Sequence, residues 1–506
     1  MFQASKRRWV QPAAIDWLLA LAQGFVAPLV VLLAYLHTLA PGVTWANDGA
    51  DSGDLITAAA TLGIAHPTGY PTYLLLARAF QLIPLGDIAW RTTMLSAVAG
   101  VLAAWLAGRA VYDIVGTDDW AAHAGAASAT LLFGCSPLLW SQSVIAEVYS
   151  VNAVFVVLAL WLALRVLVRT APQSAWQQRG SALLLGLGMG VHSTTALMAA
   201  MWYIACAIAD VRSGRRWLLV ERALWCATGL LVYMYLPVRA AAHPPINWGA
   251  PRDLAGIWWV VSGALYRPLM FGVPIDEIGV RSLLMAQRLY QQVGLVGGAL
   301  SILGLLHSWR SRISVFSWFS LSAVLLYLLV AASYRTTDAY VYLIPGVAIA
   351  AIWAGCGLVV VLRWFQRWPA APTLALFVLL GWFAWRAAST LPAVDASADR
   401  RAIVFATQVL KTAPPHALIV TSSDLDAFPL WYYHYALKTR PDLVVLVDPL
   451  LEFAWYRDNL RALYPALVLA EAPAADASWA DTLVRDNPGL PLCRTDPEGP
   501  VALACD

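Results

Sequence analysis

The chain has 506 residues, of which 60% are hydrophobic and only 12% are charged, and its mean hydropathy is +0.64. This balance excludes an ordinary water-soluble globular protein, because such proteins carry about 25% charged residues. The net charge is only +3, and Lys and Arg stand in short clusters between apolar runs. No continuous basic face is offered to nucleic acid, so nucleic-acid binding is set aside.

The first apolar run extends over residues 17–36, behind Lys6, Arg7 and Arg8. A bilayer crossing needs roughly 20 apolar residues, so we predict a retained anchor here, with the N-terminus in the cytoplasm. Eight further apolar runs predict spans near residues 93–112, 121–141, 149–168, 217–236, 290–308, 313–332, 341–362 and 371–390.

Residues 181–210 are interrupted by Gly186, Gly188 and Gly190, and His192 lies in the middle of the run. Two short helices that meet near His192 fit this pattern better than one long span. Counting them as two gives about eleven transmembrane helices in all.

Arginine clusters test this arrangement, because basic residues favour the cytoplasmic side. One topology places all of them there: Arg165, Arg169, Arg179, Arg212, Arg215, Arg216, Arg310, Arg312, Arg363 and Arg367. The loop near Asp113, Asp118 and Asp119 is acidic where a basic loop is expected, although acids weigh little in this rule. The topology exports loops 37–92 and 237–289 and the tail beyond residue 391.

The composition changes abruptly at Pro392, which predicts a transmembrane domain over residues 1–391 and a small extracytoplasmic α/β domain over residues 392–506. Short β-rich runs occur at 416–421 and 442–448. Cys493 and Cys505 lie close enough in this tail to form a disulfide, which would place it in an oxidising compartment. The other four cysteines lie in or beside apolar runs and are interpreted as buried hydrophobes.

Three acids, Asp48, Asp51 and Asp54, follow the first span at a spacing of three residues. If the chain is helical from Asp51 onward, Asp51 and Asp54 share a face and can flank one reacting group. The alternative interpretation makes Asp51 or Ser52 an N-cap, which explains one acid but not three. An exported carboxylate near the membrane can act as general base on an acceptor hydroxyl.

A turn that contains His66 and Tyr70 follows, and two interpretations of His66 stay open. It binds a phosphate or substrate oxygen, or it is hydrogen-bonded structure. Glu147 opens an apolar span, where a carboxylate is costly without a partner; the alternative is an interfacial acid that reaches towards water.

Exported arginines oppose the topological bias and need a separate explanation. Phosphate is one natural partner, because guanidinium binds its oxygens in a fork. Salt bridges with Asp253, Asp276, Glu277 or Asp338 explain each arginine equally well when it is taken singly. Clustering favours phosphate for the group, which consists of Arg239, Arg252, Arg267 and Arg335.

Several motifs resemble the signature of glycosyltransferase family 117, long catalogued as a domain of unknown function. The most specific stretch is 51–71, and the likeness continues over nearly the whole chain, at 146–152, 235–239, 247–251, 424–433, 440–442 and 455–456. The eukaryotic members that the first motif resembles are protein O-mannosyltransferases of the endoplasmic reticulum.

The resemblance implies a GT-C membrane glycosyltransferase that takes sugar from a polyprenyl-phosphate donor and has an essential acid in the first exported loop. By position that acid is Asp51. The family usually has Glu where this chain has Asp54, so the second carboxylate reaches about one methylene less far.

We therefore expect transfer of a sugar, with mannose as the first choice, to a hydroxyl acceptor such as protein Ser or Thr on the non-cytoplasmic face, with inversion. Asp51 is the expected base, with Asp54 and Glu147 orienting it or the acceptor. His66, Arg239 and Arg335 are expected to stabilise the lipid phosphate, and Asp48 and Tyr70 to support the acceptor or the loop.

No metal ligand is assigned and no cofactor is obligatory, although three acids in one loop could hold Mg²⁺ or Mn²⁺. A transporter or lipid flippase is the main rival hypothesis, but the ionisable residues gather in exported loops rather than at the membrane midplane. A scaffold whose tail binds a partner leaves the acids unexplained. The Ala- and Trp-rich style of the chain favours a bacterial inner membrane.

Overall fold

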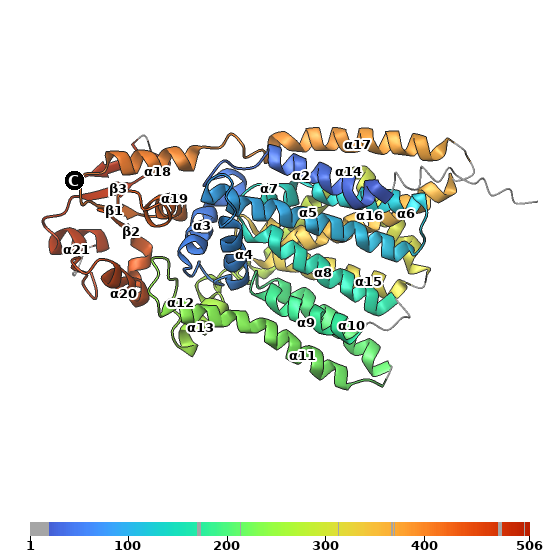
Figure 1. Ribbon diagram of the computed structural model, residues 1–506, viewed down its shortest axis with the longest axis horizontal. Coiled ribbons are helices and arrows are strands. Elements are labelled where there is room, and N and C mark those ends of the chain that lie inside the picture. Colours follow the sequence, from blue (N-terminus) through green and yellow to red (C-terminus); the bar gives the residue numbers. More distant parts are fainter. Residues whose placement is uncertain are drawn as a thin grey trace, which may run out of the picture.

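The computed structural model describes residues 20–168, 174–212, 214–311, 313–365, 368, 370–473, 478–499 and 501–505. The basic residues before the predicted anchor, the first three residues of that anchor, and Arg169, Arg312 and Arg367 lie outside this description. The long helices run side by side in one bundle, and the strands lie beyond one end of it, beside the C-terminus (Figure 1).

Seven helices in the described part of the chain are long and apolar enough to cross a membrane. The pair α6 (Trp120–Gly134) and α7 (Pro137–Ser143), bent by 64°, adds an eighth if it is one broken span. The seven are α5 (Ile88–Val115), α8 (Val148–Val168), α11 to α12 (Trp217–Ala240), α14 (Ile275–Trp309), α15 (Ser314–Ser333), η5 with α16 (Ala339–Trp364) and α17 (Ala371–Val394). They and the bent pair coincide with the eight predicted runs between residues 93 and 390, and the chain is an integral membrane protein.

The remaining predicted crossings are shorter. The anchor appears as the apolar helix Gln23–His37, whose main part is α2 (Ala27–His37). The interrupted run forms α9 (Ala175–Met189) and α10 (Thr195–Arg212), so the predicted break near His192 is confirmed. The predicted count of about eleven spans is not confirmed by length and composition, which support seven or eight among the described residues.

The two large exported loops fold between the bundle and the strands. The first forms η2 (Ala46–Asp51), α3 (Ser52–Thr61) and α4 (Pro71–Gln81), and the second contains α13 (Leu254–Val261) and η4 (Ala264–Tyr266). An isolated parallel bridge between Ile64 and Asn247 joins them. The loops therefore form one layer against the membrane part (Figure 1).

The tail contains a four-stranded sheet in the order β2-β1-β3-β4. Strand β1 is parallel to β2 and β3, and β3 and β4 are antiparallel. Both predicted β-rich runs form strands. The strands are β1 (Leu418–Thr421), β2 (Val444–Val447), β3 (Leu492–Thr495) and β4 (Leu503–Cys505).

Helices α18 (Arg401–Thr412), α19 (Asp424–Trp431), α20 (Ala454–Leu463) and α21 (Trp479–Asp486) surround these strands, with the short turns η6 (Tyr432–Ala436) and η7 (Asp448–Glu452) between them. Buried residues of the sheet, such as Leu446, belong to the same apolar cluster as Leu55 and Ile64 of the first exported loop. Because tail and loop share this core, the division into domains at residue 392 stays a prediction.

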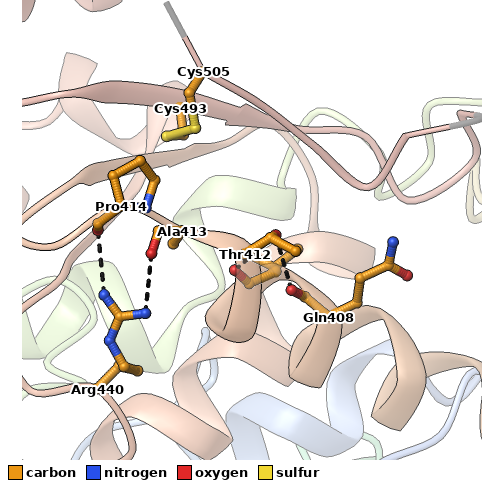
Figure 2. The surroundings of a disulfide bond; sticks show 8 residues. Gln408, Thr412, Ala413, Pro414, Arg440, Cys493 and Cys505 are labelled. Atoms are coloured by element: carbon orange, nitrogen blue, oxygen red, sulfur yellow. Dashed lines mark hydrogen bonds between the residues drawn. A yellow bond between two sulfur atoms is a disulfide. The ribbon is translucent and has the colours of Figure 1, made fainter.

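The predicted disulfide between Cys493 and Cys505 is confirmed, and it joins β3 to β4 (Figure 2). Nearby, Arg440 donates hydrogen bonds to the carbonyls of Ala413 and Pro414, at 3.1 and 3.2 Å. The hydrogen bonds of Arg440 fix the turn between α18 and β1, and the disulfide ties the last strand covalently to the sheet.

Candidate active site

A cavity of about 740 Å³ lies where the exported loops, the ends of several spans and the tail converge. Four of the predicted site residues line it: Asp48, Asp51, His66 and Tyr70. Its remaining lining comes from segments far apart in the sequence: residues 45–50, 67–70, 149, 192–194, 261–270, 330–342 and 424–425.

The sequence around η2 turns the chain sharply into α3. Asn47 and Asp48 adopt left-handed backbone conformations with φ of 56° and 59°, which short polar side chains tolerate better than most. Helix α3 then starts at Ser52, so the chain is helical directly after Asp51. Asp51 occupies the N-cap position but makes no capping hydrogen bond, and its carboxylate stays available to the cavity.

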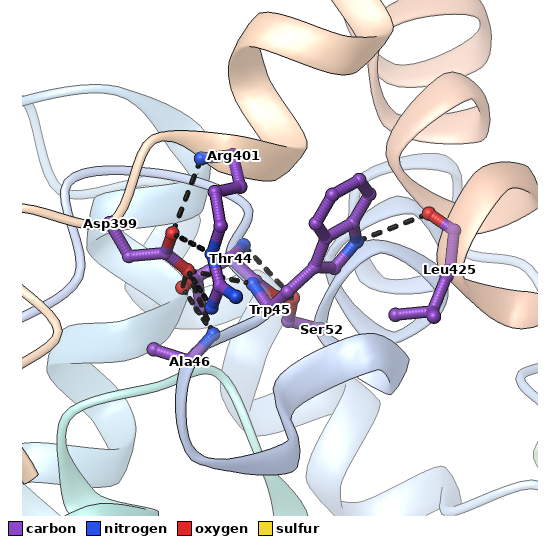
Figure 3. A network of polar contacts seen from close by, with 7 residues as sticks. All are labelled: Thr44, Trp45, Ala46, Ser52, Asp399, Arg401 and Leu425. Atoms are coloured by element: carbon purple, nitrogen blue, oxygen red, sulfur yellow. Dashed lines mark hydrogen bonds and ion pairs between the residues drawn. The ribbon is translucent and has the colours of Figure 1, made fainter. Parts of the chain in front are cut away.

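The tail holds this loop in place through Asp399 (Figure 3). Its carboxylate accepts hydrogen bonds from the hydroxyl of Thr44 at 2.6 Å and from the amides of Trp45 and Ala46 at 3.0 and 2.8 Å. The indole of Trp45 in turn donates to the carbonyl of Leu425, at 3.1 Å. The geometry of the acidic loop therefore depends on residues some 350 positions later in the chain.

Asp399 also pairs with Arg401 at 2.8 Å. Burial would raise the pKa of Asp399, but hydrogen bonds from Arg401 and Thr44 outweigh it and hold that pKa well below its usual range. The anchor of the loop therefore remains ionised across the physiological pH range.

His66 is the centre of the site. Its Nδ1 donates to Asp54 at 2.7 Å and its backbone amide donates to the same oxygen at 3.0 Å. Trp248 donates to the other oxygen of Asp54 at 3.1 Å, and Asp54 is fully buried. On the far side of the ring, Nε2 lies 3.1 Å from the hydroxyl of Tyr70 and 3.6 Å from Asp51. Asp54 thus orients His66, and His66 faces Asp51.

The charges in this group shift one another. Burial opposes the protonation of His66, but the carboxylates of Asp51 and Asp54 outweigh it and raise its pKa to about 9. Loss of bulk water in the pocket raises the pKa of Asp51, while His66 pulls it down. At neutral pH His66 is therefore a cation next to an acid whose side chain is 40% exposed.

Glu147 and Asp48 stand at the edges of this group. Glu147 is only 3% exposed and does not line the cavity; its carboxylate accepts from the amide of Val148 at 3.1 Å. Burial raises the pKa of Glu147 well above its usual range, and the negative charge of Asp51 adds to the shift. Asp48 lines the cavity and accepts a hydrogen bond from Tyr340.

The exported arginines differ in whether their guanidinium groups already make hydrogen bonds within the protein. Arg239 donates its Nε to the carbonyl of Leu62 at 2.6 Å, and it does not line the cavity. Arg252 and Arg267 are bound to His243 and Ser262. The guanidinium of Arg335 differs from these three.

Arg335 is exposed, and its guanidinium has no hydrogen-bond or ion-pair partner within the described ranges. Its neighbours Tyr334 and Thr336 line the cavity. The alternative explanation of the exported arginines was pairing with acids of the second loop or with Asp338. Among the residues the structure describes, none of the four arginines forms such a pair, so that explanation fails.

Sequence reasoning missed several residues that line the cavity. Asp424 enters from the tail, and Asp338 and a group of aromatic side chains enter from the spans and loops. Loss of bulk water around Asp424 and the nearby charge of Asp51 raise its pKa to about 7. The missed rings are Tyr149, His192, Tyr266, Tyr334 and Tyr342. Tyr149 and Asp424 stand inside motifs that the sequence singled out, but only folding brings them to this cavity.

No group of three or more His, Cys, Asp or Glu side chains within the described ranges is placed to hold a metal ion. The positive charge next to Asp51 is that of protonated His66.

Solved structures share the fold of this chain. Over 92% of this chain and 97% of the other, the fold matches ArnT from Cupriavidus metallidurans bound to undecaprenyl phosphate, with a TM-score of 0.60 and 12% identity. The archaeal oligosaccharyltransferase AglB from Archaeoglobus fulgidus, in complex with an inhibitory peptide and a dolichol-phosphate, matches with a TM-score of 0.51 and 11% identity over 87% and 68% of the two chains. The chain has the GT-C glycosyltransferase fold.

Comparisons of the sequence test the predicted family resemblance. Residues 51–213 match the model of the TMEM260 protein O-mannosyl-transferase N-terminal domain, and residues 402–470 match TMEM260-associated domain 2. The Mus musculus protein O-mannosyl-transferase TMEM260 is 29% identical over 456 residues, 83% of this chain and 62% of that protein. The Dictyostelium discoideum tmem260 protein is 24% identical, over 85% and 58%. The predicted family resemblance is confirmed, and the chain spans about three fifths of the length of these relatives.

Proposed function

We propose that the protein is a hexosyltransferase that moves a sugar, mannose in the first instance, from a polyprenyl-phosphate donor to the hydroxyl of a protein Ser or Thr. The observation that carries this proposal is the hydrogen-bonded group of Asp54, His66 and Tyr70 beside Asp51, which opens into the 740 Å³ cavity. The names of the relatives and the lipid phosphates in the titles of the two structures support the same chemistry.

Asp51 is the base in this mechanism. Its carboxylate takes the proton from the acceptor hydroxyl while the hydroxyl oxygen attacks the anomeric carbon. The bond from that carbon to the phosphate oxygen breaks on the opposite face, and its electron pair leaves with the lipid phosphate. One displacement of this kind inverts the anomeric configuration.

The buried residues prepare Asp51 for this step. Asp54 receives two hydrogen bonds from His66 and one from Trp248, so the imidazole cannot rotate. Protonated His66 faces Asp51 at 3.6 Å and favours its ionised form against the burial that opposes it. Asp51 and Asp54 together keep His66 protonated, while burial favours the neutral form of Glu147 behind it.

Arg335 is the residue to which we assign the donor phosphate, because its guanidinium is uncommitted and its neighbours line the cavity. A guanidinium can stabilise the charge that grows on the phosphate as it leaves. Arg239 has a supporting role in this proposal, since it holds the turn at Leu62 that leads to His66. Asp48 is tied to Tyr340 and borders the acceptor space.

The reaction takes place on the non-cytoplasmic side in this proposal. The disulfide of the tail is expected in an oxidising compartment. The cavity is lined in part by Asp424 and Leu425 of α19, a helix that lies at the tail end of the bundle (Figure 1). Counting Gln23–His37, α9 and α10 as crossings beside the eight longer ones restores the count of about eleven. Labelling of single cysteines introduced at loop tips in intact cells tests this arrangement directly.

The test of the function is sugar transfer from a radiolabelled polyprenyl-phosphate donor pool in purified membranes, with wild type, Asp51→Asn and Glu452→Gln at matched expression. Glu452 is an exposed tail acid outside the cavity, so its variant controls for charge. We expect a loss of about 10²- to 10⁴-fold for Asp51→Asn only. Unchanged transfer by Asp51→Asn would remove the proposed base, and absence of transfer by wild type would favour a transporter.

A further inference from the structure

Helix α19 of the tail forms part of the cavity wall, through Asp424 and Leu425. The hydrogen bond from Trp45 to the carbonyl of Leu425 fixes the first turn of this helix to the acidic loop (Figure 3). One turn further, Gly53 of α3 lies so close to Phe428 that an added Cβ would stand 2.3 Å from its carbonyl oxygen. The tail therefore contributes a rigidly placed wall to the cavity.

The two acids in the first turn of α19 have different surroundings. Asp426 is fully buried and accepts hydrogen bonds from the hydroxyls of Ser423 and Thr495, at 2.8 and 2.7 Å. It serves as the capping-box partner of the helix. Asp424 is exposed towards the cavity and has no hydrogen-bond or ion-pair partner among the residues that the structure describes. The fold uses Asp426 and leaves the carboxylate of Asp424 available.

Charge is unevenly distributed around the cavity. Asp48 and Asp51 of the first loop and Asp424 of the tail form what we call the acidic wall, in which protonated His66 lies beside Asp51. Arg335 belongs to the segment 330–342 on the span side, where its neighbours Tyr334, Thr336 and the acid Asp338 line the cavity. A phosphate that arrives from the membrane is favoured near Arg335 and is repelled by the acidic wall.

We propose that Asp424 is a specificity-determining residue that reads the charge of the acceptor, and that it favours a hydroxyl residue flanked by a basic side chain over one flanked by an acidic side chain. The inference rests on the proposed function, since it assigns the acceptor to the acidic wall. The strands and helices of the tail lie beyond one end of the bundle of spans (Figure 1), and in this proposal a water-soluble acceptor arrives from that end.

The experiment measures binding of three fluorescent peptides to the full chain in lipid nanodiscs, at pH 8, where the Asp424 carboxylate is largely ionised. The peptides are identical except for Lys, Gln or Glu directly before a single Thr. We expect the Lys peptide to bind about tenfold more tightly than the Glu peptide. The ratio should fall to about threefold in Asp424→Asn and stay unchanged in the control Glu452→Gln.

Asp424→Lys provides a second, stronger variant, which should reverse the order of the Lys and Glu peptides. Thermal unfolding of each variant in the same nanodiscs verifies that the fold is kept. An unchanged Lys-to-Glu ratio in both variants, or no binding of any peptide to wild type, would overturn the inference. Sugar transfer is measured separately: charge-selective binding without transfer contradicts the proposed function alone, and transfer without charge selection contradicts the role of Asp424 alone.

Discussion

The two sides of the cavity differ in how their charged groups are held. On the side of the first loop, Asp54 and His66 bind each other, and Asp399 of the tail fixes the loop in front of them. On the side of the spans, Arg335 is exposed and its guanidinium has no partner within the described ranges.

This difference suggests a division of labour. Proton transfer requires donor and acceptor atoms at fixed distances, so a preorganised group suits the base. A lipid phosphate must enter and leave in every cycle, and a mobile guanidinium can follow it. We therefore expect substitutions on the first side to lower kcat, and substitutions on the second side to raise KM for the donor.

The largest effect after loss of Asp51 is expected for Asp54→Asn. Asn keeps the size of the side chain but removes the charge that holds the His66 imidazole. We expect kcat to fall by about 10²-fold with little change in the donor KM, measured as initial rates of transfer in membranes. An equal rise in donor KM would mean that the first side binds the donor as well.

Raising the pH should disrupt the pairing of His66 with Asp51 and Asp54 without any mutation, and the transfer rate measured against pH reports it. The pKa of His66 is raised from 6.5 to about 9, so the stability that its protonation contributes is fully present below pH 6.5 and is lost as the pH rises through about 9. Transfer should fall about tenfold by one unit above that pKa, and it should fall again in acid as Asp51 becomes protonated.

His66→Gln is the control for this profile, because Gln cannot titrate. Its transfer rate should be low and should lack the alkaline limb. An alkaline limb that persists in His66→Gln would assign the titration to another group.

Arg335→Gln tests the span side of the cavity, where we place the donor phosphate. We expect about a tenfold higher donor KM with kcat nearly unchanged, because a charge-assisted hydrogen bond to phosphate is lost. Arg239→Gln is the matched variant, and it should lower the thermal stability of the protein instead, since Arg239 holds the carbonyl of Leu62. A larger donor KM effect at Arg239 than at Arg335 would reverse the two assignments.

The smallest effect is expected where the tail meets the loop. Gly53→Ala places a methyl group against the carbonyl of Phe428 and should destabilise the docking of α19 by about 1–3 kcal/mol. Limited proteolysis of the tail and thermal unfolding in nanodiscs measure this. Gly180→Ala, where nothing lies within 4 Å of the added atom, should leave both unchanged. Equal behaviour of the two variants would mean that the tail is not held through α3.

The spans could be predicted because lipid imposes a simple rule of length and composition, and eight of the predicted runs reappear as helices or as the bent pair. Asp51, Asp54 and His66 could be predicted because they are close in sequence. Asp424 and the contact between Asp399 and Trp45 could not, because both depend on packing between segments more than 350 residues apart. The sequence likewise does not distinguish the committed Arg239 from the free Arg335.

The measurement that tests the central claim most directly is the anomeric configuration of the product. Purified full-length protein would be reconstituted with a synthetic polyprenyl-phosphate mannose of known configuration and a Thr peptide, and the glycopeptide would be examined by NMR. The single displacement with Asp51 as base predicts a product inverted relative to the donor. A product with retained configuration would contradict it.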